Sequence, residues 1–273
     1  MFSQTHPRNL VEAFFTTMGL IYTTTVKNLR QSDRSPIMGI LRPVIQSAVM
    51  IGMMYVFYAF LGVKRSPIPG SFLLYIFSGI FMFLTQNQAM AAVAGAPNGA
   101  SPVLLHGPMN TAIAVTAKAL TNLYQLFLSS VIMLVTVNYF FEPLNIDNVL
   151  GFLGMFLLAW FTGASIGMVL YAATPWAPEV VNIIKLIYMR LNMVASGKMF
   201  VANMLNAKML ALFSWNPLFH TIDQARGYAF LDYNPYFSDW SYPLKVAVVF
   251  LVVGMLWEHY TRKFISVSWS AGK

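Results

Sequence analysis

Six stretches of mostly apolar residues constrain what this chain can fold into. They fall at residues 37–62, 71–95, 108–138, 149–174, 178–202 and 242–262. A helix needs about 20 apolar residues to cross the hydrocarbon core of a bilayer, which is ~30 Å thick. Because no water is present there to bond the backbone, a helix is the structure expected for each stretch. We therefore predict an all-α membrane protein with six transmembrane helices.

The composition agrees with this prediction and excludes several classes of protein. The chain is 58% hydrophobic and 10% charged, whereas a soluble domain carries about 25% charged residues. Its net charge of +8 is therefore read as a signal of membrane topology, not of nucleic-acid binding. Without cysteine, an HExxH motif or a GxxxxGK[ST] loop, the chain offers no catalytic, metal or nucleotide site of its own.

The distribution of basic residues predicts the orientation, because Lys and Arg gather in cytosolic connections. With the N-terminus in the cytosol, eight basic residues lie inside and four lie outside. The inner residues are Arg8, Lys27, Arg30, Arg34, Arg42, Arg262, Lys263 and Lys273, and the outer residues are Lys64, Arg65, Lys208 and Arg226. Both termini are therefore predicted to be cytosolic.

The chain divides into an N-terminal segment (1–33), a transmembrane domain (34–262) and a short cytosolic tail (263–273). In the N-terminal segment, apolar residues recur at helical spacing: Val11, Phe14, Phe15, Met18, Tyr22, Val26 and Leu29. This pattern predicts an amphipathic helix that lies in the membrane interface. The alternative is a helix that packs on the cytosolic side of the protein itself.

The stretch SWNPLFHTIDQARGYAF, from Ser214 to Phe230, lies between the last two apolar stretches but differs from them. Asn216 followed by Pro217 is typical of a helix start, which predicts a helix over 217–230. Such a helix is roughly 20 Å long, too short to cross a membrane, and it carries Asp223 and Arg226. One interpretation of these two charges is an ion pair on the protein surface.

Polar and aromatic side chains inside the predicted spans are candidates for a substrate path. On the fifth span, Lys185 and Asn192 share one helical face with Asn182 and Ser196, while Arg190 points elsewhere. This polar face either joins neighbouring helices or, through Lys185 and Arg190, attracts anions to a lumen. The aromatic candidates are Tyr55, Tyr58 and Tyr188, which belong either to interfacial belts or to a conduit that stacks on sugars.

In the order of these features the chain resembles the permease subunit of ABC-2 type exporters. It is most similar to the branch that exports capsular polysaccharide, and O-antigen permeases are near relatives. The resemblance extends from about residue 34 to 263. It rests on Arg34-Ser35-Pro36-Ile37-Met38-Gly39 to Pro43, on Ala195-Ser196-Gly197, and on Trp215-Asn216-Pro217-Leu218-Phe219-His220 followed by Asp223 and Arg226.

The resemblance implies roles for two connections. Residues 203–241 would form re-entrant outer helices that gate the conduit, with Trp215, Asn216, Pro217, His220, Asp223 and Arg226 as the gate residues. The connection between the second and third spans would dock on an ATPase through Pro102, Val103, Leu104, Leu105 and His106. This connection has no charged residue from Gly95 to Asn110, unlike its counterparts in relatives.

The resemblance also implies a function. The chain would form a homodimer, pair with two copies of a separate ABC ATP-binding subunit, and export a lipid-linked capsular or other surface polysaccharide across the bacterial inner membrane. ATP and Mg would be bound by that ATPase, and periplasmic or outer-membrane export proteins would be further partners. The alternatives are an ABC-2 exporter of drugs or lipids, and a membrane assembly protein with no transport role.

Overall fold

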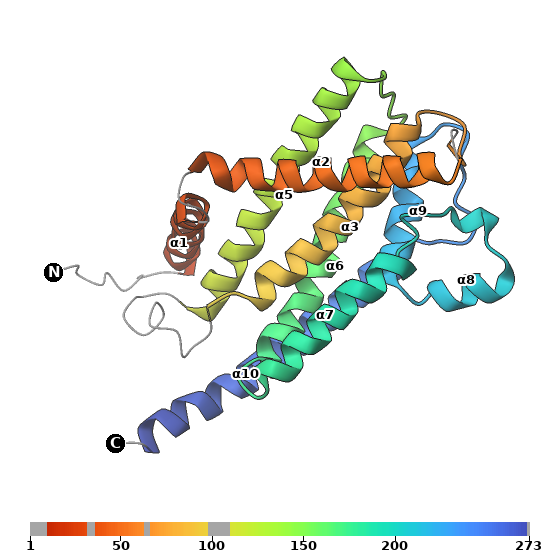
Figure 1. The fold of residues 1–273 in the computed structure, drawn as a ribbon. Helices are drawn as coiled ribbons and strands as arrows, with labels where there is room; N and C mark the ends of the chain where they lie inside the picture. Colours follow the sequence, from red (N-terminus) through yellow and green to blue (C-terminus); the bar gives the residue numbers. More distant parts are fainter. Residues whose placement is uncertain (1–9, 32–35, 63–65, 98–109, 272–273) are drawn as a thin grey trace.

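The structure, a computed structural model, describes residues 10–31, 36–62, 66–97 and 110–271. Within these ranges every regular element is a helix, and no strand occurs (Figure 1). The helices are α1 (Leu10–Gln31), α2 (Pro36–Phe60), α3 (Phe72–Ala94), α5 (Thr111–Phe140), α6 (Val149–Ala173), α7 (Pro178–Ala195), the 3-10 turn η1 (Ala202–Met204), α8 (Ala207–Phe213), α9 (Pro217–Ala229) and α10 (Ser241–Ala271).

Five of the described helices are long and apolar enough to cross a membrane. They are α2 over Leu41–Phe60, α3, α5, α6, and α10 over Ser241–Lys263. These five helices coincide with the first four predicted spans and the sixth. The chain is thus an all-helical protein of the multi-pass membrane class.

The fifth predicted span, 178–202, corresponds to α7, which ends earlier than expected. α7 has 18 residues, and three of them are charged: Glu179, Lys185 and Arg190. These charges keep α7 out of the set of five apolar helices. The chain turns after Ala195 because Gly197 takes a φ of +78°, a left-handed conformation that glycine adopts without steric cost.

α6 packs closely on α3 and on α10, and glycines allow these helices to approach one another. A Cβ atom added to Gly163 of α6 would lie 2.2 Å from the Gln86 carbonyl oxygen of α3. On the other face of α6, a Cβ atom on Gly254 of α10 would lie 2.8 Å from the Met168 side chain. Small residues let membrane helices approach this closely.

The bundle has two distinct ends (Figure 1). We call the end with α1, the α6–α7 turn and the last turns of α10 the terminal end, and the end with α8 and α9 the α9 end. α1 packs on α5, and most of its predicted apolar face stays exposed, whereas Val26 and Leu29 are partly buried. The exposed side chains of this face are Val11, Phe14, Phe15, Met18 and Tyr22.

Candidate functional site

The predicted helix after Asn216 is confirmed as α9. The Asn216 side chain accepts a hydrogen bond from the Leu218 backbone N–H at 3.0 Å, and Pro217 is the first helical residue. This is the capping arrangement expected from the sequence. One apolar face of α9 is fully buried against the core, and it consists of Leu218, Ile222, Ala225 and Ala229.

Asn216 also joins α9 to the two neighbouring helices through a chain of side-chain amides. Its Nδ2 donates to Asn192 Oδ1 on α7 at 3.0 Å and to the Ala195 carbonyl at 3.1 Å. Asn192 Nδ2 donates to Asn87 Oδ1 on α3 at 3.2 Å, and Asn87 Nδ2 donates to the Phe83 carbonyl at 3.0 Å. We call Asn216, Asn192 and Asn87 the amide ladder. All three are buried, so these bonds form away from water and fix the three helices in register.

Arg226 is the largest fully buried side chain described. Its Nη1 donates to the carbonyls of Gly197 and Phe200 at 2.8 and 2.6 Å. Its Nη2 donates to the Lys198 carbonyl at 2.9 Å. The guanidinium lies 4.2 Å from the centre of the Tyr75 ring. Arg226 therefore holds the turn that follows α7 and makes a cation–π contact with α3.

Asp223 is also buried, and its partners lie on the connection to α10. Its two carboxylate oxygens accept hydrogen bonds from the Tyr233 hydroxyl at 2.5 Å and from Ser238 Oγ at 2.7 Å. Burial, and next the charge of Asp223, raise the pKa of Tyr233, so its hydroxyl stays a donor. The interpretation of Asp223 and Arg226 as a surface ion pair is wrong, because both described side chains are buried and each bonds to other groups.

His220 joins the residues that precede α9 to those that follow it. Its Nε2 donates to the Ser214 carbonyl at 2.7 Å, and its Nδ1 accepts from the Asp239 backbone N–H at 3.1 Å. Burial lowers the pKa of His220 below its ordinary value. The neutral ring with the proton on Nε2 satisfies both contacts. The Trp215 side chain is half exposed, and its carbonyl accepts from the Tyr242 hydroxyl at 2.7 Å.

The structure does not bring the predicted substrate-path residues to one surface. Tyr58 is buried and donates to the Met199 carbonyl, and Tyr188 accepts from Gln86 Nε2 at 2.9 Å. Tyr55, Lys185 and Arg190 are exposed or partly exposed, and Lys185 donates to Asn182 Oδ1 at 3.0 Å. The contacts of Asn192 favour the helix-joining interpretation of the polar face on α7.

Sequence reasoning missed Lys198 as a component of this site. Its side chain is only 3% exposed, and its ammonium lies 3.8 Å from the centre of the Phe83 ring. No carboxylate among the described residues pairs with it. Nearby on the α3–α7 contact, Gln86 Oε1 and Ser196 Oγ have no hydrogen-bond partner within the described chain. The position of Lys198 directly after the predicted Ser196-Gly197 motif was the one available signal.

Two further points concern the predicted ATPase-docking residues and metal binding. The predicted ATPase-docking residues, Pro102 to His106, lie outside the described residues. Across the described ranges, no group of three His, Asp or Glu side chains lies close enough to hold a metal ion.

The fold and the α9 site thus define a multi-pass helical membrane protein with a short, buried, polar helix at one end of its bundle. A scan against protein-family models finds no match for this chain, and a search of curated proteins finds no relative of it.

Proposed function

We propose that this chain is the membrane-spanning subunit of an ABC-2 type exporter. Two copies would form a homodimer in the bacterial inner membrane, with both termini in the cytosol. Each copy would work with a separate ATP-binding subunit, which would bind ATP and Mg. The exported substrate would be a lipid-linked capsular or other surface polysaccharide.

The observation that carries this proposal is α9. It is a 13-residue helix with buried Asp223 and Arg226, fixed between α3, α7 and the start of α10. A short polar helix is stable at membrane depth only where protein or water surrounds it. An outer gate beside an aqueous route provides such surroundings. In this proposal the gate residues are Trp215, Asn216, Pro217, His220, Asp223 and Arg226.

Two further helices support the proposal. α7 runs between the same two ends of the bundle as the apolar helices (Figure 1), and its 18 residues are just within the length range of a membrane crossing. A second copy beside α7 would shield Lys185 and Arg190 from lipid. The exposed apolar face of α1 suits the membrane interface.

Co-purification and export assays test the proposal. A tagged full-length chain should retain an ATP-binding subunit. Deletion of the gene that encodes this chain should remove polysaccharide from the cell surface. Changed drug tolerance with intact surface polysaccharide would instead favour a drug or lipid exporter. Absence of any bound ATPase would favour an assembly protein with no transport role.

The chain has no cysteine, so single introduced cysteines report topology directly. We expect Leu231→Cys, at the exposed connection after α9, to react with a membrane-impermeant thiol reagent added outside. Glu179→Cys, at the opposite end of α7, should react only after the membrane is permeabilised. The reverse pattern would contradict the outer gate.

A further inference from the structure

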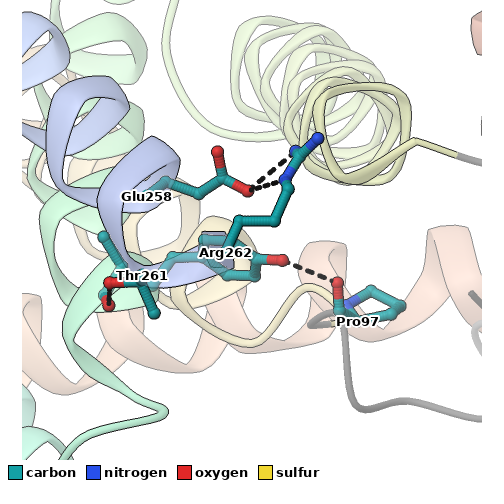
Figure 2. Close-up of polar contacts among 6 residues, drawn as sticks. Pro97, Glu258, Thr261 and Arg262 are labelled. Carbon is teal, nitrogen blue, oxygen red and sulfur yellow. Dashed lines mark hydrogen bonds and ion pairs between the residues drawn. The ribbon is translucent and has the colours of Figure 1, made fainter. Parts of the chain in front are cut away.

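Three helices are fastened together by hydrogen bonds at the terminal end of the bundle (Figure 2). The Tyr171 hydroxyl on α6 donates to the Pro97 carbonyl, just beyond the end of α3, at 2.9 Å. The carbonyl of the next residue, Ala172, accepts from Thr261 Oγ1 on α10 at 3.3 Å. Thr261 Oγ1 also accepts from Trp176 Nε1 in the α6–α7 turn at 2.8 Å. We call Tyr171, Pro97, Ala172, Thr261 and Trp176 the terminal clasp.

Two of the side chains in the terminal clasp are shielded from solvent, whereas the Trp176 side chain is half exposed. The exposed fractions of Tyr171 and Thr261 are 3% and 4%. Tyr171 belongs to one buried apolar cluster with Val93 of α3 and with Ala96, just beyond the end of α3. On α10, Glu258 and Arg262 form an ion pair at 2.8 Å, which Figure 2 shows above the Pro97 contact. A buried hydroxyl that loses its acceptor pays a desolvation penalty, so these bonds resist separation of the helices.

The same three helices are in close contact along their length, as the glycine positions show. On α6, a Cβ atom added to Gly167 would lie 2.6 Å from the Met90 carbonyl oxygen of α3, one helical turn beyond the Gly163 contact. On α10, Gly254 packs equally closely on Met168 of α6. Tightly packed helices move as a body, because a packed core does not deform gradually. α10 begins at the α9 end, where the Tyr242 hydroxyl donates to the Trp215 carbonyl and the Asp239 N–H, just before α10, donates to His220.

We infer that Tyr171 is a positioning residue that couples the end of α3 at Pro97 to α6 and α10. A displacement of the chain at Pro97 is then passed through the terminal clasp to α10. Along α10 it reaches the gate residues Trp215 and His220. The inference rests on the proposed function, because there the displacement comes from the partner ATPase, acting on the connection that follows α3.

Tyr171→Phe is the sharpest perturbation, because it removes the hydroxyl and keeps the packed ring. Thr261→Val removes the other two hydrogen bonds of the terminal clasp, those with Ala172 and Trp176, at nearly constant volume. Tyr139→Phe is the matched control, since Tyr139 lies 79% exposed on α5 and the same atom is removed. All three are made in the full chain.

The first measurement requires no partner. Hydrogen exchange is followed at the backbone amides of residues 93–96, just before Pro97, in the purified full-length chain. We expect exchange in Tyr171→Phe to rise about fivefold, the size set by one net hydrogen bond, and exchange in Tyr139→Phe to match the wild type. Unchanged exchange in Tyr171→Phe would overturn the inference and leave the proposed function standing.

The second measurement uses the chain reconstituted with its ATPase in vesicles, with ATP hydrolysis and exported polymer measured together. We expect Tyr171→Phe and Thr261→Val to hydrolyse ATP at the wild-type rate and to export about fivefold less polymer per ATP. Wild-type export per ATP, or a parallel loss of hydrolysis and export as from general unfolding, would overturn the inference. If the wild-type chain binds no ATPase, the proposed function fails, and the coupling role of Tyr171 fails with it.

Discussion

Replacing Arg226 with methionine removes the three hydrogen bonds that close the turn after α7 and leaves a side chain of similar length. The lost partners are the carbonyls of Gly197, Lys198 and Phe200, and the contact with Tyr75 is lost as well. Hydrogen bonds from a charged group contribute ~1.5–3 kcal/mol each, and the cation–π contact adds ~0.5–2 kcal/mol. Relief from burying the guanidinium offsets part of this sum, so we expect a net loss of ~3–5 kcal/mol.

Thermal unfolding of the purified full chain, in one detergent throughout, measures this loss. At about 2–4 °C per kcal/mol for a chain of this size class, the midpoint should fall by roughly 6–20 °C. Arg226→Lys keeps the charge, but its shorter side chain with one nitrogen lacks the planar fork that reaches three carbonyls. Its midpoint should therefore lie between those of the wild type and of Arg226→Met. Arg190→Met, on the exposed side of α7, is the control and should stay within ~0.5 kcal/mol of the wild type. A midpoint for Arg226→Met equal to that of the control would refute the reasoning.

Three further perturbations give distinct outcomes. Gly163→Val should separate α3 from α6 and cost ~3 kcal/mol or more of unfolding free energy, whereas Gly154→Ala, with open space around it on the same helix, should be neutral or stabilising. Burial lowers the pKa of His220, so the contribution of this residue to stability is complete above pH ~6.5 and is lost as the pH falls through the lowered pKa. Thermal unfolding measured between pH 7.5 and 5.5 should show this loss in the wild type and not in His220→Gln. Replacing Lys185 and Arg190 together by Gln should lower export at unchanged membrane levels, and unchanged export would remove their proposed role in attracting an acidic substrate.

The helix boundaries that the sequence predicts best are those set by local chemistry. Asn216-Pro217 determines where α9 begins, because a cap acts within three residues of itself. The end of α7 was placed seven residues too late, because the apolar stretch runs on through 199–202 and hides the turn at Gly197. A run of apolar residues reports burial or lipid contact but not whether the backbone stays helical.

Long-range partners could not be predicted in this way. The partners of Arg226 lie 26 to 29 residues away in sequence and are backbone carbonyls, which any residue type presents. In the sequence, Lys198 is not distinguished from the other basic residues of the fifth span. Its burial over Phe83 depends on how the turn after α7 packs on α3. Only the placement of helices in space determines such contacts.

The amide ladder has a direction, and the start of α9 sets it. Asn216 must turn its oxygen to the Leu218 N–H, so its nitrogen faces Asn192, whose nitrogen in turn faces Asn87. Every amide is thereby locked in one of its two orientations. Aspartate, an equally good residue for starting an ordinary helix, would place oxygen against oxygen at the first step here. Reversing one amide would require reversing all three. The three hydrogen bonds of the amide ladder therefore form together, when α9 is in place, or not at all.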